Sequence, residues 1–594
     1  MARRAERLAL PVGVVATFAI LLVVFYYPVG SVLVAAVVRS GRLTLGPLAD
    51  VLGDPFYTGV LAGAVRDPLG VPAGLGGWVR AGFPSIGFGL FGFTAWQAAL
   101  STVASVAVGL PGAYLLARFE FVGRRTLRSL TIVPFVLPSI MVAVGFLAMF
   151  GQNGSLNDLL GLLGLGPVGG VLFTLKAVVL AHAFYNAPLV TRLVTTAWES
   201  VDARRVESAR SLGASRLRAF RDVVLPELAP AVLTAALLTF VFTFLSFPIV
   251  LALGGLQLAT VEVWLYARVQ DLALGEAATL GTIETVLSLS LTYLYLRYEA
   301  RQVRSRGTTT LSRHRLSVGW RTLRDPVRVG LFAYGLVVVL LFVGPLVSMV
   351  VESFTGPNGL TTANYAFLAR QQAATAVGTI RPLPAVRNSL LFSLGTLLLA
   401  VPMGVVVSVL AARGGRGSRV AETLMSAPLA VSGVVVGLGM LQTLVFGTTV
   451  AGHRLVASGP VAIVFAHAVA AYPFVSRNVT PALSGIDSRL LDSARSLGAS
   501  RFRVLLDVEL PLVATAVLAG AAFAFAISIG EFDSTVLLSQ GVNTYTMPVA
   551  LERYIGNRSV GPSLGPATAM GTVLLVVTAA SFLVIDRLGG RWQP

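Results

Sequence analysis

The sequence of 594 residues has no cysteine, a single lysine and only four histidines. Without cysteine the chain cannot form a disulfide, a zinc–thiolate site or a thiol nucleophile. The histidines have no closely spaced histidine, aspartate or glutamate partners, which argues against a metal cluster. Charged residues are scarce as well, at 12% against 55% hydrophobic residues, with a mean hydropathy of +0.80. A soluble protein of this length could not cover its surface with so few charges, so the composition indicates a membrane protein.

Hydrophobic runs of about 20 residues, each long enough to cross a bilayer, recur along the chain. The alternating pattern of barrel strands is missing, so the spans are predicted to be helices. Twelve spans are expected, at residues 10–38, 93–117, 130–150, 171–192, 230–252, 273–297, 329–351, 388–412, 421–446, 459–476, 513–533 and 565–586. The expected fold class is therefore an all-α polytopic membrane protein.

The formal net charge of +18 comes from arginines that cluster in short segments between the expected spans. Such clusters are typical of the positive-inside rule, so we interpret them as topology signals and expect no nucleic-acid partner. Residues 1–7 hold three arginines and precede a run that is too long for a signal-peptide core. The sequence thus predicts a multi-pass protein of the cell membrane, embedded in the lipid bilayer, with both termini in the cytoplasm.

One charged, glycine-containing segment occurs twice. The stretch "ESARSLGASRLRAFRDVVLPELAP" begins at Glu207, and "DSARSLGASRFRVLLDVELPLVAT" begins at Asp492, 285 residues later. Other matches have the same offset, among them Phe247 with Phe532. Six spans is an even number, so the two halves are expected to be parallel repeats related by a pseudo-twofold axis along the membrane normal. A substrate route is expected between such halves, as in a transporter.

The repeat divides the chain into three parts. The first half is expected at residues 1–297, an arginine-rich cytoplasmic linker at 298–328, and the second half at 329–594. Each half holds its copy of the repeated segment in a cytoplasmic loop between its fourth and fifth spans, at about 200–229 and about 485–514.

Each copy is predicted to form a helix, a turn at Gly213 or Gly498, and a second helix that ends at Pro226 or Pro511. The turn carries small side chains beside arginines. Small residues let another backbone come close and arginines pair with carboxylates, so the segment suits docking into a groove of a soluble partner. Two copies predict two identical partner surfaces.

The pattern Glu-x-Ala-x3-Gly followed by Leu-Pro resembles the EAA loop of permease subunits of ATP-binding-cassette (ABC) importers. It is formed by Glu207, Ala209, Gly213, Leu225 and Pro226, and again by Asp492, Ala494, Gly498, Leu510 and Pro511. Serine replaces the first alanine of the family pattern in both copies, and the late proline, Pro230, becomes Thr515 in the second.

The resemblance implies the fold of type I importer transmembrane domains and a coupling helix that sits in a cleft of a separate ATPase. Two copies of that ATPase and an extracytoplasmic solute-binding protein are the implied partners. The positions to which coupling is carried over are Glu207, Ala209, Gly213, Ala214, Arg216, Pro226, Asp492, Ala494, Gly498, Ala499, Arg501 and Pro511.

No phosphate-binding P-loop is expected, because that motif needs a lysine after its second glycine and the only lysine, Lys176, follows Leu175. The chain is therefore predicted not to be an enzyme. It is expected to bind no cofactor, with ATP and magnesium bound by the partner ATPase.

A fused twelve-span permease with two such loops most resembles the group that serves thiamine and iron(III). The stretches "LAHAFYNAPLVTRLV" from Leu180 and "FLSFPIVLALGGLQLATVEVWLYA" from Phe244 are closer to the thiamine permeases, and the second half is similar through "ISIGEFDSTVLLS" from Ile527. Thiamine or its phosphates is therefore the expected substrate, and iron(III) or another small solute is the alternative. The alternative class is an ion-coupled secondary transporter, which would bury ionisable residues within its spans. The expected spans are nearly free of such residues, with Lys176 and Glu284 as the main exceptions, which argues against this class.

Thiamine carries a cationic ring, which aromatic and acidic groups would attract. The candidate pathway residues are Phe247, Glu262, Trp264, Glu531, Phe532 and Asp533. The competing interpretation is that they lie at the membrane interface, where aromatics and charges are ordinary. His182 and His467 occupy matching places and are expected to pack or hydrogen-bond between helices rather than bind a metal.

Overall fold

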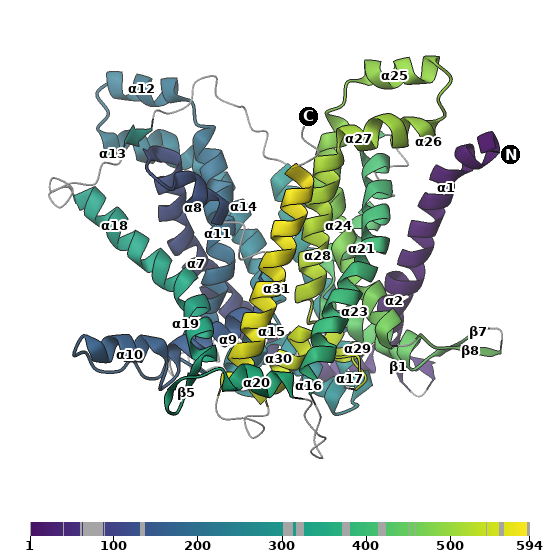
Figure 1. Cartoon of the computed structure of the whole chain (residues 1–594), viewed down its shortest axis with the longest axis horizontal. Helices are drawn as coiled ribbons and strands as arrows, with labels where there is room; N and C mark the ends of the chain where they lie inside the picture. Colours follow the sequence, from purple (N-terminus) through teal and green to yellow (C-terminus); the bar gives the residue numbers. More distant parts are fainter. Residues whose placement is uncertain are drawn as a thin grey trace.

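The computed structural model describes residues 2–39, 41–59, 62, 87, 89–130, 137–300, 313–315, 326–370, 380–413, 423–450, 452–457, 459–541, 543–556 and 564–590. Within these ranges the chain is almost entirely helical, and long helices run between two ends of the molecule (Figure 1). The all-α fold class expected from the sequence is confirmed.

The helices of the first half, short π and 3-10 turns (η) included, are α1 (Ala2–Leu21), η1 (Leu22–Tyr26), α2 (Tyr27–Ala35), α3 (Gly46–Gly53), α4 (Pro55–Thr58), α7 (Gly89–Arg118), α8 (Arg124–Leu130), α9 (Ser139–Phe150), α10 (Ser155–Leu162), α11 (Leu175–Glu199), α12 (Ala203–Ser211), α13 (Arg216–Ala219), η3 (Phe220–Val224), α14 (Leu225–Phe244), α15 (Pro248–Gly254), η4 (Gly255–Leu258), α16 (Val261–Gln270) and α17 (Leu274–Ala300).

The helices of the second half are α18 (Pro326–Val338), η6 (Val339–Val343), α19 (Gly344–Ser353), α20 (Ala363–Ala369), α21 (Pro382–Arg413), η7 (Ala427–Ala430), α23 (Gly433–Met440), η8 (Leu441–Val445), α24 (Gly459–Ser484), α25 (Ser488–Ser496), α26 (Arg501–Val504), η9 (Leu505–Glu509), α27 (Leu510–Leu512), α28 (Ala514–Gly530), α29 (Thr535–Leu538), α30 (Met547–Gly556) and α31 (Gly565–Gly590).

In the part of the chain that the structure describes, eight short strands form four pairs. The strands are β1 (Val38–Arg39), β2 (Arg42–Leu43), β3 (Phe119–Glu120), β4 (His314–Arg315), β5 (Thr355–Gly356), β6 (Gly359–Leu360), β7 (Thr448–Val450) and β8 (His453–Leu455). Three pairs are antiparallel hairpins, whereas β3 and β4 pair in parallel across a long sequence separation. The β3–β4 pair brings a piece of the expected linker against the first half.

Among the described residues, nine helices are long and apolar enough to cross a membrane, and the number reaches twelve if each of three bent pairs counts as one span. The expected ninth span is one of these pairs, bent by 101° between η7 and α23. The expected fifth span is wrong at its end, because α14 stops at Phe244 and a bent helix pair, Pro248–Leu258 with Val261–Gln270, follows it. Proline suits the first turn of a helix, so Pro248 starts α15 instead of continuing α14.

The first span of each half packs against the other half. Helix α2 contacts α23, and α19 contacts α9. A Cβ atom at Gly439 of α23 would lie 2.5 Å from the backbone oxygen of Pro28, and one at Gly145 of α9 would lie 2.7 Å from that of Pro345. Glycine at both places permits this close backbone contact. The first span of each half therefore packs on the other half in an equivalent way.

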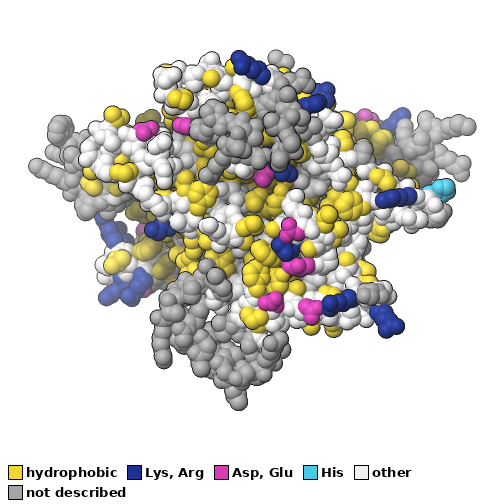
Figure 2. All heavy atoms as spheres, turned by 90° about the horizontal axis from the view of Figure 1, so that it is seen from below, with side chains coloured by type: hydrophobic (Ala, Val, Ile, Leu, Met, Phe, Trp, Pro, Cys, Tyr) yellow, Lys and Arg dark blue, Asp and Glu magenta, His cyan; other side chains and the backbone are white. Residues whose placement is uncertain are grey.

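One hydrophobic cluster runs through both halves, and many large apolar side chains remain exposed on the outside, among them Val103, Phe332 and Leu398. An apolar exterior is what a surface in contact with lipid requires. Helices α12 and α25 lie apart at one end of the molecule, and both chain termini lie at that end (Figure 1). The opposite end shows a few acidic and basic side chains among hydrophobic ones (Figure 2).

Candidate coupling loops and transport pathway

The first copy of the repeated segment forms a helix, a glycine turn and a second helix. Asp202 caps the start of α12 by accepting a hydrogen bond from the backbone N–H of Arg204 at 3.0 Å. The turn follows at Gly213, whose φ of +88° lies in the region that glycine adopts most easily. The backbone N–H of Ala214 donates to the carbonyl of Ala209 at 3.1 Å, which closes the end of α12.

The second copy has the same geometry. Asp487 caps α25, Gly498 has a φ of +85°, and the N–H of Ala499 donates to the carbonyl of Ala494 at 3.1 Å. The motif spacing is thereby explained, because the residue four after the motif alanine must be glycine to reverse the chain. The next helix begins at Arg216 in the first copy and at Arg501 in the second, each after a serine cap.

Most of the positions assigned to coupling are exposed. Glu207 and Asp492 lie on the surfaces of α12 and α25, and Asp492 pairs with Arg495 at 3.1 Å. The strongest feature of both surfaces was not among the expected site residues: the side chains of Leu212 and Leu497 are 89% and 90% exposed. Two exposed leucines at equivalent positions give each loop an apolar surface, and their recurrence in the repeat is the sequence signal that could have identified them.

The prediction that a proline ends the second helix is wrong at Pro226 and holds within one residue at Pro511. In the first half α13 continues through the π turn η3 into α14, so Pro226 lies inside one continuous helix, Arg216–Phe244, just after the π turn. In the second half η9 leads into α27, and the chain bends by 80° after Leu512. Thr515, which replaces the late proline, lies just beyond that bend.

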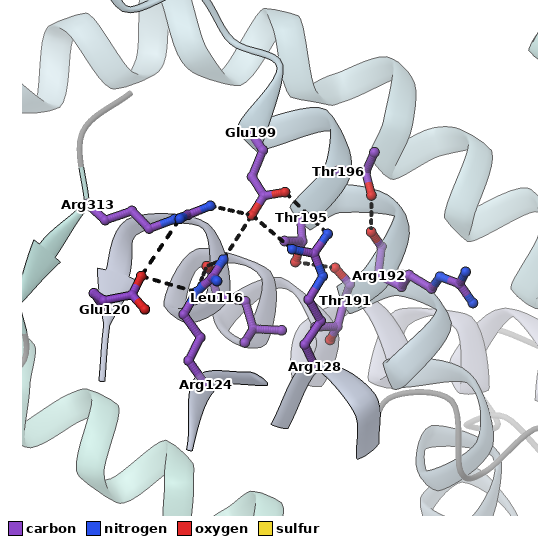
Figure 3. A network of polar contacts seen from close by, with 10 residues as sticks. All are labelled: Leu116, Glu120, Arg124, Arg128, Thr191, Arg192, Thr195, Thr196, Glu199 and Arg313. Atoms are coloured by element: carbon purple, nitrogen blue, oxygen red, sulfur yellow. Dashed lines mark hydrogen bonds and ion pairs between the residues drawn. The ribbon is translucent and has the colours of Figure 1, made fainter. Parts of the chain in front are cut away.

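An ion-pair network secures the helix that leads into α12 (Figure 3). Glu199, the last residue of α11, accepts hydrogen bonds from Arg124 at 2.9 Å, from Arg128 at 3.4 Å and from Arg313 at 3.0 Å. Arg124 is buried and also donates to the carbonyl of Leu116. Since Arg313 belongs to the expected linker, the linker contributes directly to the support of the first loop.

The second half supports its loop differently. Arg413, at the end of α21, donates to both carboxylate oxygens of the buried Glu509 in η9, at 3.0 and 2.9 Å. This ion pair, in which one guanidinium nitrogen contacts both carboxylate oxygens, ties the helix after the turn to a membrane span. The two exposed loops are therefore alike, whereas the contacts that hold them to the membrane domain differ. No local sequence pattern predicts either network, because the partners are far apart in the chain.

Of the expected pathway residues, Phe247 and Phe532 meet across the two halves. Their rings are stacked with centroids 5.5 Å apart and planes inclined by 21°, and both side chains are almost fully buried. Tyr266 of α16 packs on Phe247 with a centroid separation of 5.2 Å. The stacked pair lies in the contact between the two halves. Phe247 directly precedes α15 and Phe532 lies shortly before α29, at the end of the molecule away from α12 and α25 (Figure 1).

The matching histidines form hydrogen bonds between helices, as predicted. His182 lies between Ser101 and Ser246, with both separations 2.9 Å. His467 lies between Ser528 at 2.8 Å and Thr535 at 2.7 Å. Its Nε2 is also 3.1 Å from an oxygen of Glu531.

Glu531, a further expected pathway residue, is fully occupied by its neighbours. Besides His467, its carboxylate accepts from the backbone N–H groups of Ser534 at 2.8 Å and Thr535 at 3.1 Å, at the start of α29. The repeat places Ser246 where the second half has Glu531. Glu531 thus orders the backbone that carries Phe532.

Glu262 and Asp533 come together from opposite halves, whereas Trp264 lies elsewhere. Asp533 is close enough to Glu262 to interact electrostatically. Trp264 packs on Phe56 at 4.8 Å, and the guanidinium of Arg268 lies 4.6 Å from the centroid of its ring. The structure therefore groups five of the six expected pathway residues around the contact between the halves and leaves Trp264 outside it.

A duplicated helical bundle with one exposed loop per half and an apolar exterior defines a transmembrane permease built from two halves. The family described as "Binding-protein-dependent transport system inner membrane component" matches residues 109–304 and 400–593, once in each half. The chain belongs to this family. It is a multi-pass transport subunit of an ABC importer, which excludes the secondary-transporter alternative.

Several relatives carry the description "Thiamine transport system permease protein ThiP". The one from Escherichia coli (strain K12) is 28% identical over 531 residues, covering 86% of this chain and 91% of that protein. The one from Salmonella typhimurium is 30% identical over 516 residues, with coverage of 84% and 88%. The one from Brucella abortus (strain 2308) is 27% identical over 545 residues, with coverage of 91% and 95%.

The solved structures that match share less sequence identity and a smaller part of this chain than the thiamine permeases do. A bacterial ABC transporter involved in the import of the acidic polysaccharide alginate matches with a TM-score of 0.38 and 18% identity, covering 45% of this chain and 96% of that chain. The same transporter type in complex with its alginate-bound periplasmic protein gives a TM-score of 0.36.

Proposed function

We propose that this chain is the permease through which thiamine, or a phosphate ester of thiamine, enters the cell. The supporting observation is the similarity, over most of both chains, to permeases described as thiamine transporters. An extracytoplasmic binding protein delivers the substrate, and a separate ATPase supplies the energy. No metal-binding group of three or more side chains occurs in the part of the chain that the structure describes.

Two copies of the ATPase dock on the exposed loops that contain α12 and α25. The docking surface consists of the two turns, which share one geometry, together with the exposed Leu212 and Leu497 and the charges of Glu207 and Asp492. The end of the molecule that holds these loops is then the cytoplasmic end, and both termini lie in the cytoplasm (Figure 1). ATP and magnesium are bound by the partner.

We infer that the pathway runs between the halves, and the Phe247–Phe532 stack, which joins the two halves, supports this as the point where the pathway is closed. Each ring covers the face of the other, so a cation can reach neither face until the halves separate. Movement of the ATPase subunits, transmitted through the two loops, would separate the rings and open the pathway to the binding protein.

Uptake in cells that lack this chain tests the proposal. Labelled thiamine should fail to enter these cells, and the wild-type chain should restore its entry. Excess unlabelled thiamine should compete with the label, and iron(III) should not. Restoration of iron(III) uptake without thiamine uptake would replace the proposed substrate and leave the importer class in place.

A further inference from the structure

An apolar segment leaves the helical bundle sideways at the end of the molecule opposite α12 and α25 (Figure 1). It consists of α10 and the chain that leads to α11, residues 155–173. Leu162, the last residue of α10, is 86% exposed. The other exposed apolar side chains of the segment are Leu159, Leu163, Leu165, Val168 and Phe173. An exposed apolar surface of this kind marks a contact with another protein or with a membrane.

The segment carries a single charge. Asp158 is its one ionisable residue, and the next charged residue along the chain is Lys176, the only lysine, which is exposed at the start of α11. Leu159, Leu162 and Leu163 are spaced three and four residues apart, so they share one face of α10. An apolar helix face of this kind, with charges only at its margins, suits a helix that lies along a membrane surface.

Asn157 holds the segment in this shape. Its Nδ2 donates to the carbonyl oxygens of Gly151 at 3.1 Å and of Gln152 at 3.2 Å. Its Oδ1 accepts a hydrogen bond from the backbone N–H of Val168 at 2.8 Å. One side chain thus ties the chain before α10 and the chain after it to the helix, so the exposed leucines belong to a fixed surface.

The apolar exterior of the bundle continues into the segment. Ser155, the first residue of α10, hydrogen-bonds to Ser348 of α19, and α10 also packs on α9. On α19, Val347 and Val351 are about half exposed. Exposed apolar side chains of a membrane span face lipid. The segment therefore begins at the border of a surface that is already in contact with lipid.

The backbone of the segment limits how deep it lies. Between α10 and α11 the chain is irregular, and irregular backbone exposed to lipid is not tolerated in the hydrocarbon core, where no water satisfies its polar groups. The carboxylate of Asp158 needs water as well. The headgroup region of the bilayer offers both water and apolar contact.

We propose that residues 155–173 form an interfacial anchor, which lies in the headgroup region of the leaflet opposite the coupling loops. Its partner is the phospholipid surface, into which the leucines insert, and the exposed Lys176 is placed to pair with lipid phosphate. A binding protein would deliver substrate over the contact between the halves, whereas α10 points sideways from the bundle (Figure 1). The inference does not depend on thiamine as the substrate.

The lack of cysteine allows a direct test with spin labels. Leu162→Cys and Leu165→Cys each place one label in the anchor. Leu497→Cys is the matched control, because Leu497 is an equally exposed leucine of the coupling loop at the other end of the molecule. Each full chain is reconstituted in phosphatidylcholine–phosphatidylglycerol vesicles without partners. Collision rates with oxygen, which concentrates in lipid, and with a water-soluble nickel chelate then give the depth of each label.

The labels at Leu162 and Leu165 should lie about 5–10 Å below the lipid phosphates, and the label at Leu497 should remain in water. Labels in the anchor that the nickel chelate reaches as readily as the label at Leu497 would overturn the proposal. The measurement is then repeated with the binding protein added. Labels that lose contact with the chelate only after this addition would also overturn the proposal, because they would assign the surface to the binding protein.

Discussion

The turns at Gly213 and Gly498 allow a test in which backbone conformation alone is changed. Both residues have φ near the value that favours glycine, +88° and +85°, and nothing lies within 4 Å of where a Cβ would be added at either place. Replacement by valine therefore creates no clash with the rest of the chain. It does introduce a β-branched side chain at a positive φ, which is among the least favourable combinations for an L-residue.

The cost of holding the native turn is about 1–2 kcal/mol for each substitution. An ATPase dimer that occupies both loops at once meets both substitutions, and because the two sites lie far apart the effects on its binding should add to about 2–4 kcal/mol. If the ATPase binds only the native turn, the double variant Gly213→Val, Gly498→Val should lose affinity by a factor on the order of 30 to 900. Coupled uptake should fall with it.

Asparagine provides the matched control, because it tolerates the left-handed region far better than valine does. The affinity of each purified double variant for the ATPase is measured by calorimetry in lipid nanodiscs. The asparagine variant should bind nearly as tightly as the wild type. If the valine and asparagine variants bound the ATPase equally well, the turn geometry would not be what the partner recognises.

The remaining predictions concern the docking surface, its support and the closed pathway. The double variant Leu212→Asp, Leu497→Asp should change the free energy of unfolding by only about 0.5 kcal/mol, because both side chains are exposed. Its affinity for the ATPase, measured by calorimetry, should fall. Unchanged affinity would exclude these leucines from the interface. Glu199→Gln should lower the free energy of unfolding by about 1–3 kcal/mol, because the charged acceptor of three arginines is lost. The control Asp492→Asn, which removes a charge from an exposed ion pair, should have almost no effect. Equal melting temperatures for the two variants would contradict this prediction. Phe532→Ala removes a buried ring from the contact between the halves, so thiamine should leak from loaded vesicles without ATP. If the vesicles retained their thiamine, the Phe247–Phe532 stack would not be the barrier.

Much of the fold could be predicted from the sequence because the signals are local. Hydrophobic runs gave the spans, and the repeat gave two matched loops with a glycine turn, which the φ values of Gly213 and Gly498 confirm. The bend at Pro248 was missed, since proline is compatible both with a kink inside a helix and with the first turn of a new one. The same ambiguity produced the error at Pro226.

The contacts between distant segments could not be predicted. Nothing near Arg313 in the sequence indicates that it reaches Glu199 across 114 residues. Similarly, Glu284 looked like an isolated buried acid until the fold brought it beside Glu262. These pairings depend on how the helices pack, which the periodicity of a single helix does not specify.

The most direct test of the account is ATP-driven uptake by a fully defined system. The purified chain, its ATPase and the thiamine-loaded binding protein are reconstituted in sealed vesicles that contain ATP on the loop side. We predict accumulation of labelled thiamine that requires ATP, the binding protein and intact turns at Gly213 and Gly498. Accumulation that persists without the ATPase, or no thiamine accumulation with every component present, would contradict the account.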